Sequence, residues 1–355
     1  MPAKFGQARG ALFGLGAAAS FGLSAPLAKL LLGQISPVLL AGLLYLGAAA
    51  GLWLYRAVTP VSKEPPLRRA DVPTLIVVVV TGGLLGPVLM LFGLARVTAL
   101  AGSLLLNFEA PLTVLLAVVL FGEHLGRYAV IAVSCVFAGA LLLKLESGVF
   151  GGPVGVHTGG VALLAAACLC WALDNNLTQR LSLRDPFAIV RVKTLVAGVV
   201  NTTLGLVLTR AELPSAGYVA AALALGSVSY GVSVVLDAYA LRLVGAAREA
   251  AYFATAPFVG ALASVVLLGD ALRWHDSLAI AVMAMGVIAL LRERHGHRHA
   301  HDTIEHEHLH EHDAHHQHEH PEGTPAGEPH SHVHRHQPLT HDHPHVPDAH
   351  HRHRH

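Results

Sequence analysis

The hydrophobic positions of the chain fall into long apolar runs that short polar connections separate. Such runs recur throughout, for example at 11–32, 73–95 and 187–209. Each is long enough to cross a hydrocarbon layer of about 30 Å as a helix. The pattern predicts an all-α integral membrane protein with ten transmembrane helices, at 11–32, 36–55, 73–95, 98–121, 127–144, 158–180, 186–209, 215–241, 246–268 and 274–291.

The first five predicted helices resemble the second five. The fourth and the ninth each contain a proline, Pro111 and Pro257, and each ends in a glycine followed by an acid, at 122–123 and 269–270. Because each half holds an odd number of helices, the two halves must be inverted in the membrane. Inverted repeats with interrupted helices are typical of secondary transporters.

The chain is therefore divided into a first repeat at 1–150, a second repeat at 151–294 and a tail at 295–355. Basic residues favour the cytoplasmic side of a membrane. With a cytoplasmic N-terminus, the inner flanks carry Lys4, Arg9, Arg56, Lys63, Arg68, Arg69, Arg127, Arg180, Arg184, Arg242, Arg248, Arg292 and Arg294. The outer flanks carry fewer, at Arg96, Lys144, Arg210 and Arg273. We expect a multi-pass cell-membrane protein whose two termini are cytoplasmic.

Composition agrees with this class. Hydrophobic residues make up 53% of the chain and charged residues 13%, whereas soluble domains carry about 25% charged residues. The net charge of +1 does not favour nucleic acid, because the basic residues lie at membrane edges. No nucleotide-binding, nucleophile-elbow, haem or zinc-finger pattern is found, so an enzyme is not expected. The expected partners are the lipid bilayer and a small-molecule or metal-ion substrate, and assembly as a homodimer is left open.

These features resemble a known family. Two five-helix repeats, each with a mid-helix proline and a glycine–acid end, are similar to the EamA-type family of the drug/metabolite transporter superfamily. The stretches 105–111 and 170–178 also resemble that family. The resemblance covers 10–292 and implies the fold and membrane transport. It does not imply a substrate, and the tail lies outside the family pattern.

The strongest candidate for transport is Glu109, because ionisable groups inside a membrane are costly and usually functional. It lies about halfway along the fourth span, two positions before Pro111, which frees a backbone carbonyl near Asn107. A carboxylate beside such carbonyls can bind a proton or a cation. The alternative is a hydrogen-bonded packing residue. We expect the substrate to bind between the repeats, near Glu109, Pro111 and Pro257.

A second polar group lies in the sixth to eighth spans. Asp174, Asn175 and Asn176 are consecutive in the sixth span. Lys193 lies about as far into the seventh span from the same side, so it can form an ion pair with Asp174 that is either a structural contact or a gate. Asp237 in the eighth span either joins this pair or lies near the interface with Arg242.

The tail holds 23 of the 26 histidines, and it is duplicated. Residues 295–320 and 330–355 match at a shift of 35 positions, with histidine on histidine and changed residues between. Imidazole binds Ni, Co and Zn ions and titrates near neutral pH. With few apolar residues, the tail is expected to be disordered without metal. The candidate metal ligands are His306, His308, His310, His315, His316, His318, His320, His341, His343, His345, His350, His351, His353 and His355.

We interpret the chain as a secondary transporter that moves a small solute by alternating access. The leading hypothesis is export of a divalent transition metal, Ni, Co or Zn. Two alternatives remain: a metabolite or drug permease whose tail only regulates or buffers metal, and a membrane-anchored metal-buffering protein. The tail can also be read as a pH-responsive segment. No cofactor is required, although the tail is a candidate to bind a transition metal.

Overall fold

The computed structural model describes most of the helical part of the chain and four segments of the tail. The described residues are 2–59, 65–121, 127–149, 158–181, 184–209, 214–244, 252–292, 295–301, 305–310, 330–335 and 339–345.

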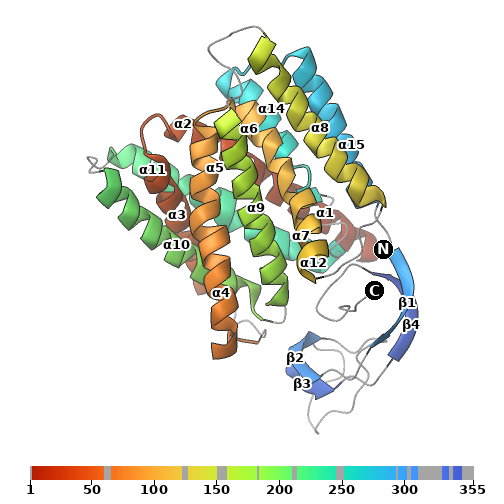
Figure 1. The fold of residues 1–355 in the computed structure, drawn as a ribbon. Coiled ribbons are helices and arrows are strands. Elements are labelled where there is room, and N and C mark those ends of the chain that lie inside the picture. The colour runs from red at the N-terminus through yellow and green to blue at the C-terminus, as the bar shows by residue number, and fades with distance from the viewer. Residues whose placement is uncertain are drawn as a thin grey trace.

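The helices form one bundle (Figure 1). The first half contains α1 (Pro2–Gly22), α2 (Ser24–Leu31), α3 (Pro37–Val58), η1 (Arg69–Asp71), α4 (Val72–Val78), η2 (Val79–Leu85), α5 (Gly86–Leu94), α6 (Ala99–Leu105), η3 (Leu106–Phe108), α7 (Glu109–Phe121) and α8 (Arg127–Val149). The second half contains α9 (Thr158–Arg180), α10 (Pro186–Thr209), α11 (Ala216–Gly226), η4 (Ser227–Val232), α12 (Ser233–Val244), α14 (Ala256–Leu268) and α15 (Trp274–Leu291).

Within the described residues, seven helical segments are long and apolar enough to cross a membrane. The other three predicted spans each contain a shorter apolar helix, at Arg127–Leu143, Ala256–Leu268 and Trp274–Ala289. Large apolar side chains such as those of Val119 and Val266 are exposed on the bundle, at 77% and 72%. Water would not favour so many exposed apolar side chains, whereas lipid would. The structure thus confirms a helical membrane protein, and the count of ten spans stays a prediction.

Three membrane helices change their winding at a proline or at glycines. Residues Val79–Leu85 (η2) form a π-helical turn just before Pro87, and Leu106–Phe108 (η3) form a 3₁₀ turn just before Pro111. A proline lacks the N–H that would bond to the carbonyl four residues earlier and its ring crowds that carbonyl. Residues Ser227–Val232 (η4) form a second π-helical turn, around Gly231. The freed carbonyls need other donors, and several of these donors form the candidate site.

The packing of the two halves follows a two-fold pattern. Helix α3 packs on α10 and α8 on α15, and each of these pairs joins helices at the same place in the two halves. Helix α6 of the fourth predicted span packs on α14 of the ninth. Helix α1 packs on α12, and its counterpart α9 packs on α5. Helices α8 and α15 lie side by side at one edge of the bundle (Figure 1). Two related halves of five spans would produce this pattern, and the π-helical turns of η2 and η4 also lie at corresponding places.

Four segments of the tail form strands, and the expected disorder of the tail without metal stays a prediction. The strands are β1 (His295–His301), β2 (Glu305–His310), β3 (His330–Arg335) and β4 (Leu339–His345). Strand β1 pairs with β4 and β2 with β3, both antiparallel. The prediction of disorder considered only the low apolar content. Histidine at every second position is also typical of a strand. Each strand of the first copy pairs with a strand of the second copy.

Candidate functional site

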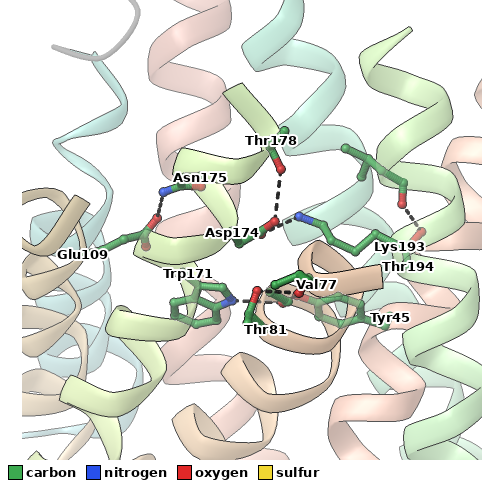
Figure 2. A network of polar contacts seen from close by, with 12 residues as sticks. Tyr45, Val77, Thr81, Glu109, Trp171, Asp174, Asn175, Thr178, Lys193 and Thr194 are labelled. Atoms are coloured by element: carbon green, nitrogen blue, oxygen red, sulfur yellow. Dashed lines mark hydrogen bonds and ion pairs between the residues drawn. The ribbon is translucent and has the colours of Figure 1, made fainter. Parts of the chain in front are cut away.

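Glu109 begins α7 directly after the 3₁₀ turn η3, at the interruption that Pro111 imposes on the fourth span. Its carboxylate Oε1 accepts a hydrogen bond of 2.8 Å from the Asn175 amide on α9 (Figure 2). The backbone carbonyl of Glu109 accepts a second hydrogen bond, from the Thr113 hydroxyl at 2.8 Å. The Glu109 side chain therefore has a neutral amide partner, which leaves its charge available to a proton or a cation.

The predicted contact between Asp174 and Lys193 is present. Lys193 Nζ lies 2.7 Å from Asp174 Oδ2, and the two side chains are 17% and 5% exposed. The other carboxylate oxygen of Asp174 accepts a hydrogen bond from Thr178 at 3.1 Å. Figure 2 shows this pair on α9 and α10, beside the Glu109–Asn175 contact. Burial of two charges is tolerated because each satisfies the other.

The π-helical turn η2 lies directly against this ion pair. The Gly82 carbonyl accepts hydrogen bonds from the Tyr45 hydroxyl at 2.9 Å and from Trp171 Nε1 at 3.2 Å. The amide of Asn201 lies 3.5 Å from the carbonyl oxygens of both Gly83 and Leu84. Side chains from three helices thus replace the helical donors that η2 lacks. We name Tyr45, Glu109, Trp171, Asp174, Asn175 and Lys193 the polar network.

Gly82 has no room for a side chain, since a Cβ at this position would overlap the Asp174 carboxylate. We expect Gly82→Ala to displace Asp174 and break the ion pair, with a loss of about 3 kcal/mol or more, because one buried charge is left uncompensated. Thermal unfolding of the detergent-solubilised protein measures this loss. Gly159→Ala is the matched control, since nothing lies within 4 Å of a Cβ there. Equal stability of the two variants would contradict the proposed packing.

The remaining candidate residues are distributed around the polar network. Asn107 lies in η3 and donates to the Leu104 carbonyl at 2.9 Å. Asn176 joins α9 to α7, because its amide donates to the Thr113 carbonyl at 3.0 Å. Both therefore bond to the backbone around the interruption. Pro257 lies in the first turn of α14, which packs on α6.

Asp237 does not join the network in the described part of the chain. It lies on α12, which packs against α1 and η4, whereas Asp174 and Lys193 lie on α9 and α10. The helix packing therefore does not favour the first of the two roles considered for Asp237, in which it joins the ion pair. Asp237 and Asp174 lie at similar depths in their predicted spans, but similar depth does not indicate which helices are neighbours.

Two charged residues outside the network connect helix ends. Lys29 Nζ lies 2.5 Å from the Leu94 carbonyl and 2.6 Å from the Val97 carbonyl, at the end of α5. Asp270 follows Gly269, which ends α14 with φ 69°, and its Oδ2 accepts a 2.9 Å hydrogen bond from Leu100 N in the first turn of α6. The sequence analysis noted position 270 only as the acid at the end of the ninth span and did not single out Lys29. A lone lysine near the end of an apolar run was the available signal.

Lys29→Met should destabilise the protein by about 1–3 kcal/mol, because the carbonyls at the end of α5 lose a charged donor. Lys29→Arg should retain most of the stability, since a guanidinium can also donate to both carbonyls. The unfolding temperatures of the two variants in the same detergent provide the comparison. Arginine and methionine variants of equal stability would show that the contact contributes nothing.

The long apolar helices, with a carboxylate and an ion pair between them, define a multi-pass helical membrane protein. The EamA-like transporter family matches twice along the chain, at residues 8–145 and 158–292. The chain therefore belongs to the EamA-like transporter family, within the drug/metabolite transporter superfamily. The resemblance noted from the sequence is confirmed.

Two known proteins are similar over most of the chain. An "uncharacterized transporter" of Methanothermobacter thermautotrophicus (strain Delta H) is 30% identical over 280 residues, covering 75% of this chain and 81% of that protein. The crystal structure of a second protein superposes with a TM-score of 0.59 at 22% sequence identity, and the match covers 79% of this chain and 97% of the other. That likeness concerns the fold alone.

Proposed function

We propose that this protein is a secondary transporter that moves a small solute across the membrane by alternating access. Family membership supports transport. The polar network is the position that we propose for the solute path. The observation that carries the proposal is the contrast between two carboxylates. Asp174 is paired with the Lys193 ammonium, whereas Glu109 is hydrogen-bonded to a neutral amide. Glu109 is therefore the carboxylate that can exchange a bound proton or cation during a transport cycle.

The changes of helical winding at η2 and η3, next to the polar network, also favour a transport path at this place. Glu109 follows the 3₁₀ turn η3, and Asp174 lies against the π-helical turn η2. Such breaks occur in transporter helices where they line a path, because backbone carbonyls and side chains there can replace the solute's water. A change in the winding at η2 or η3 would move these helix segments relative to α9 and α10. We propose this movement as the step that alternates access.

Contacts between connecting segments agree with the predicted order of spans, in which the connections after the second and the sixth span share one side of the membrane. The bias of basic residues makes that side the cytoplasmic one in our proposal. Asp71 and Arg184 form a 2.7 Å ion pair, and the backbone N–H of Asp185 donates to the Pro65 carbonyl at 2.9 Å. These residues lie in two connections that were both expected on the cytoplasmic side. The contact of Lys29 with Leu94 and Val97 joins two helix ends that were expected on the opposite side.

A second candidate function is export of Ni, Co or Zn ions through the same path. The observation that favours it is the duplicated histidine tail, which would lie on the cytoplasmic side in the proposed orientation. In this case the tail would collect or sense the ion that the bundle exports. If the solute is instead an organic metabolite or drug, the tail would adjust its transport to metal supply.

Removal of residues 295–355 distinguishes these functions. Cells that express the full chain, the shortened chain or neither are compared for Ni, Co and Zn content and for low-mass organic solutes, by mass spectrometry with and without added external metal. A metal exporter should keep its metal-lowering activity without the tail but lose its response to added metal. An organic permease should keep its solute change. A protein that only buffers metal should lose every effect, and that result would contradict transport.

A further inference from the structure

The two copies of the tail are paired with one another in a fixed register. In the first sheet, histidine lies opposite histidine at three rungs: His295 and His345, His297 and His343, His299 and His341. In the second sheet the same holds at three rungs: His306 and His334, His308 and His332, His310 and His330. Each rung takes one histidine from each copy.

The duplication interchanges the two sheets. A shift of 35 positions carries His295 onto His330, and the reverse shift carries His345 onto His310. The rung of His295 and His345 in the first sheet thus becomes the rung of His330 and His310 in the second. The other two rungs are related in the same way. The two ladders of rungs are therefore equivalent, and each needs both copies.

This relation explains which residues differ between the copies. The histidines of the six rungs match in both copies, because each faces a histidine of the other copy. The positions between them differ, as at Arg298 and Val333. In the two sheets Arg298 lies opposite Asp342 and Glu305 opposite Arg335. Opposite charges at facing positions favour this register over a slipped one.

The spacing of the rungs suits a transition metal. Directly opposed residues in an antiparallel pair have Cβ atoms about 4.5–5.5 Å apart, and residues two apart on a strand lie about 6.5–7 Å apart on the same face. Two neighbouring rungs therefore place four histidine residues, two from each copy, on one face of the sheet at the spacing of a single metal site. Four nitrogen ligands suit Zn, Ni or Co, and imidazole is a preferred ligand of all three.

We propose that the tail holds two equivalent transition-metal sites, one on each ladder, and that each site takes its histidines from both copies of the duplication. The site assignment does not depend on which solute the bundle carries. It predicts that neither copy alone provides a tight site. If each copy instead bound metal by itself, either copy would be sufficient for its own ion.

The test is a titration of the purified full chain in detergent with Co(II), followed by its visible absorption and by equilibrium dialysis, and repeated with Ni(II) and Zn(II). Three triple variants replace histidine by asparagine in one strand: His295, His297 and His299 in β1; His341, His343 and His345 in β4; His330, His332 and His334 in β3. Each should lose one of two tight sites. Combining the β1 and β4 changes should lose no further site, because both belong to one ladder, whereas combining β1 with β3 should lose both.

Deletion of residues 330–355 provides an independent measurement. We expect both sites to weaken at least about tenfold, which corresponds to 1.4 kcal/mol. Half the bound metal at unchanged affinity would overturn the proposal, as would equal losses in the two combined variants. Absence of tight binding by the full chain would overturn it as well. The Glu109 path is tested by solute movement, so failure of the metal sites is distinguishable from failure of the transport proposal.

Discussion

Glu109→Gln should abolish solute movement while it leaves the fold intact. The glutamine side-chain oxygen can accept the same hydrogen bond from Asn175 that Oε1 of Glu109 accepts at 2.8 Å. The variant, however, can neither release a proton nor attract a cation. We expect transport to fall at least about tenfold, equivalent to 1.4 kcal/mol, and stability to change by less than about 1 kcal/mol. Solute flux in membrane vesicles and thermal unfolding in detergent measure the two effects.

The matched control makes the same chemical change outside the network. Asp276 lies at the start of α15, where its carboxylate accepts a 2.9 Å hydrogen bond from the Arg273 N–H. Asp276→Asn should keep both transport and stability, because the asparagine side-chain oxygen can accept the same hydrogen bond from the Arg273 N–H. If Glu109→Gln transported as fast as the control, Glu109 would be a packing residue and the proposed coupling would be wrong.

Lys193→Met should cause the largest loss of stability, about 3–5 kcal/mol. It removes the ammonium 2.7 Å from the Asp174 carboxylate, whose side chain is only 5% exposed. A buried carboxylate without its counter-charge is strongly unfavourable. Asp174→Asn combined with Lys193→Met should recover most of the loss, since the double variant buries no charge. Unfolding curves of the two single variants and the double variant, in one detergent, give the coupling between the residues.

The result would also separate the two roles considered for this pair. A double variant that is stable and transports would make the pair a structural contact that holds η2 beside α9 and α10. A double variant that is stable but inactive would make the pair part of the gate. A double variant as unstable as Lys193→Met would contradict the energetic account, because it would mean that the charges themselves are not the cause.

Much of the site could be predicted because membrane insertion penalises charge so strongly. Few residues within the apolar runs are ionisable, so Glu109, Asp174 and Lys193 were evident as candidates. The contact of Asp174 with Lys193 followed from equal depth on two helices joined by a short connection. The interruption near Asn107 followed from the chemistry of Pro111. In each case one local rule was sufficient.

The remainder depended on which helices are neighbours, and helical periodicity does not give this information. Asp237 was placed with Asp174 by depth, yet α12 packs on α1. The contact of Asn175 with Glu109 joins residues on α9 and α7, and the role of Gly82 depends on Asp174, Tyr45 and Trp171 from two other helices. The strands of the tail were missed because low apolar content was given more weight than the regular spacing of the histidines.

The most direct test of transport through the polar network compares three sets of cells with matched expression: the full chain, Glu109→Gln with the tail intact, and no protein. Cellular Ni, Co and Zn and low-mass organic solutes are measured by mass spectrometry at fixed external metal. We predict that at least one solute or ion differs between the full chain and cells without protein, and that Glu109→Gln abolishes this difference. The same contents in cells with the full chain and with Glu109→Gln would contradict transport through Glu109.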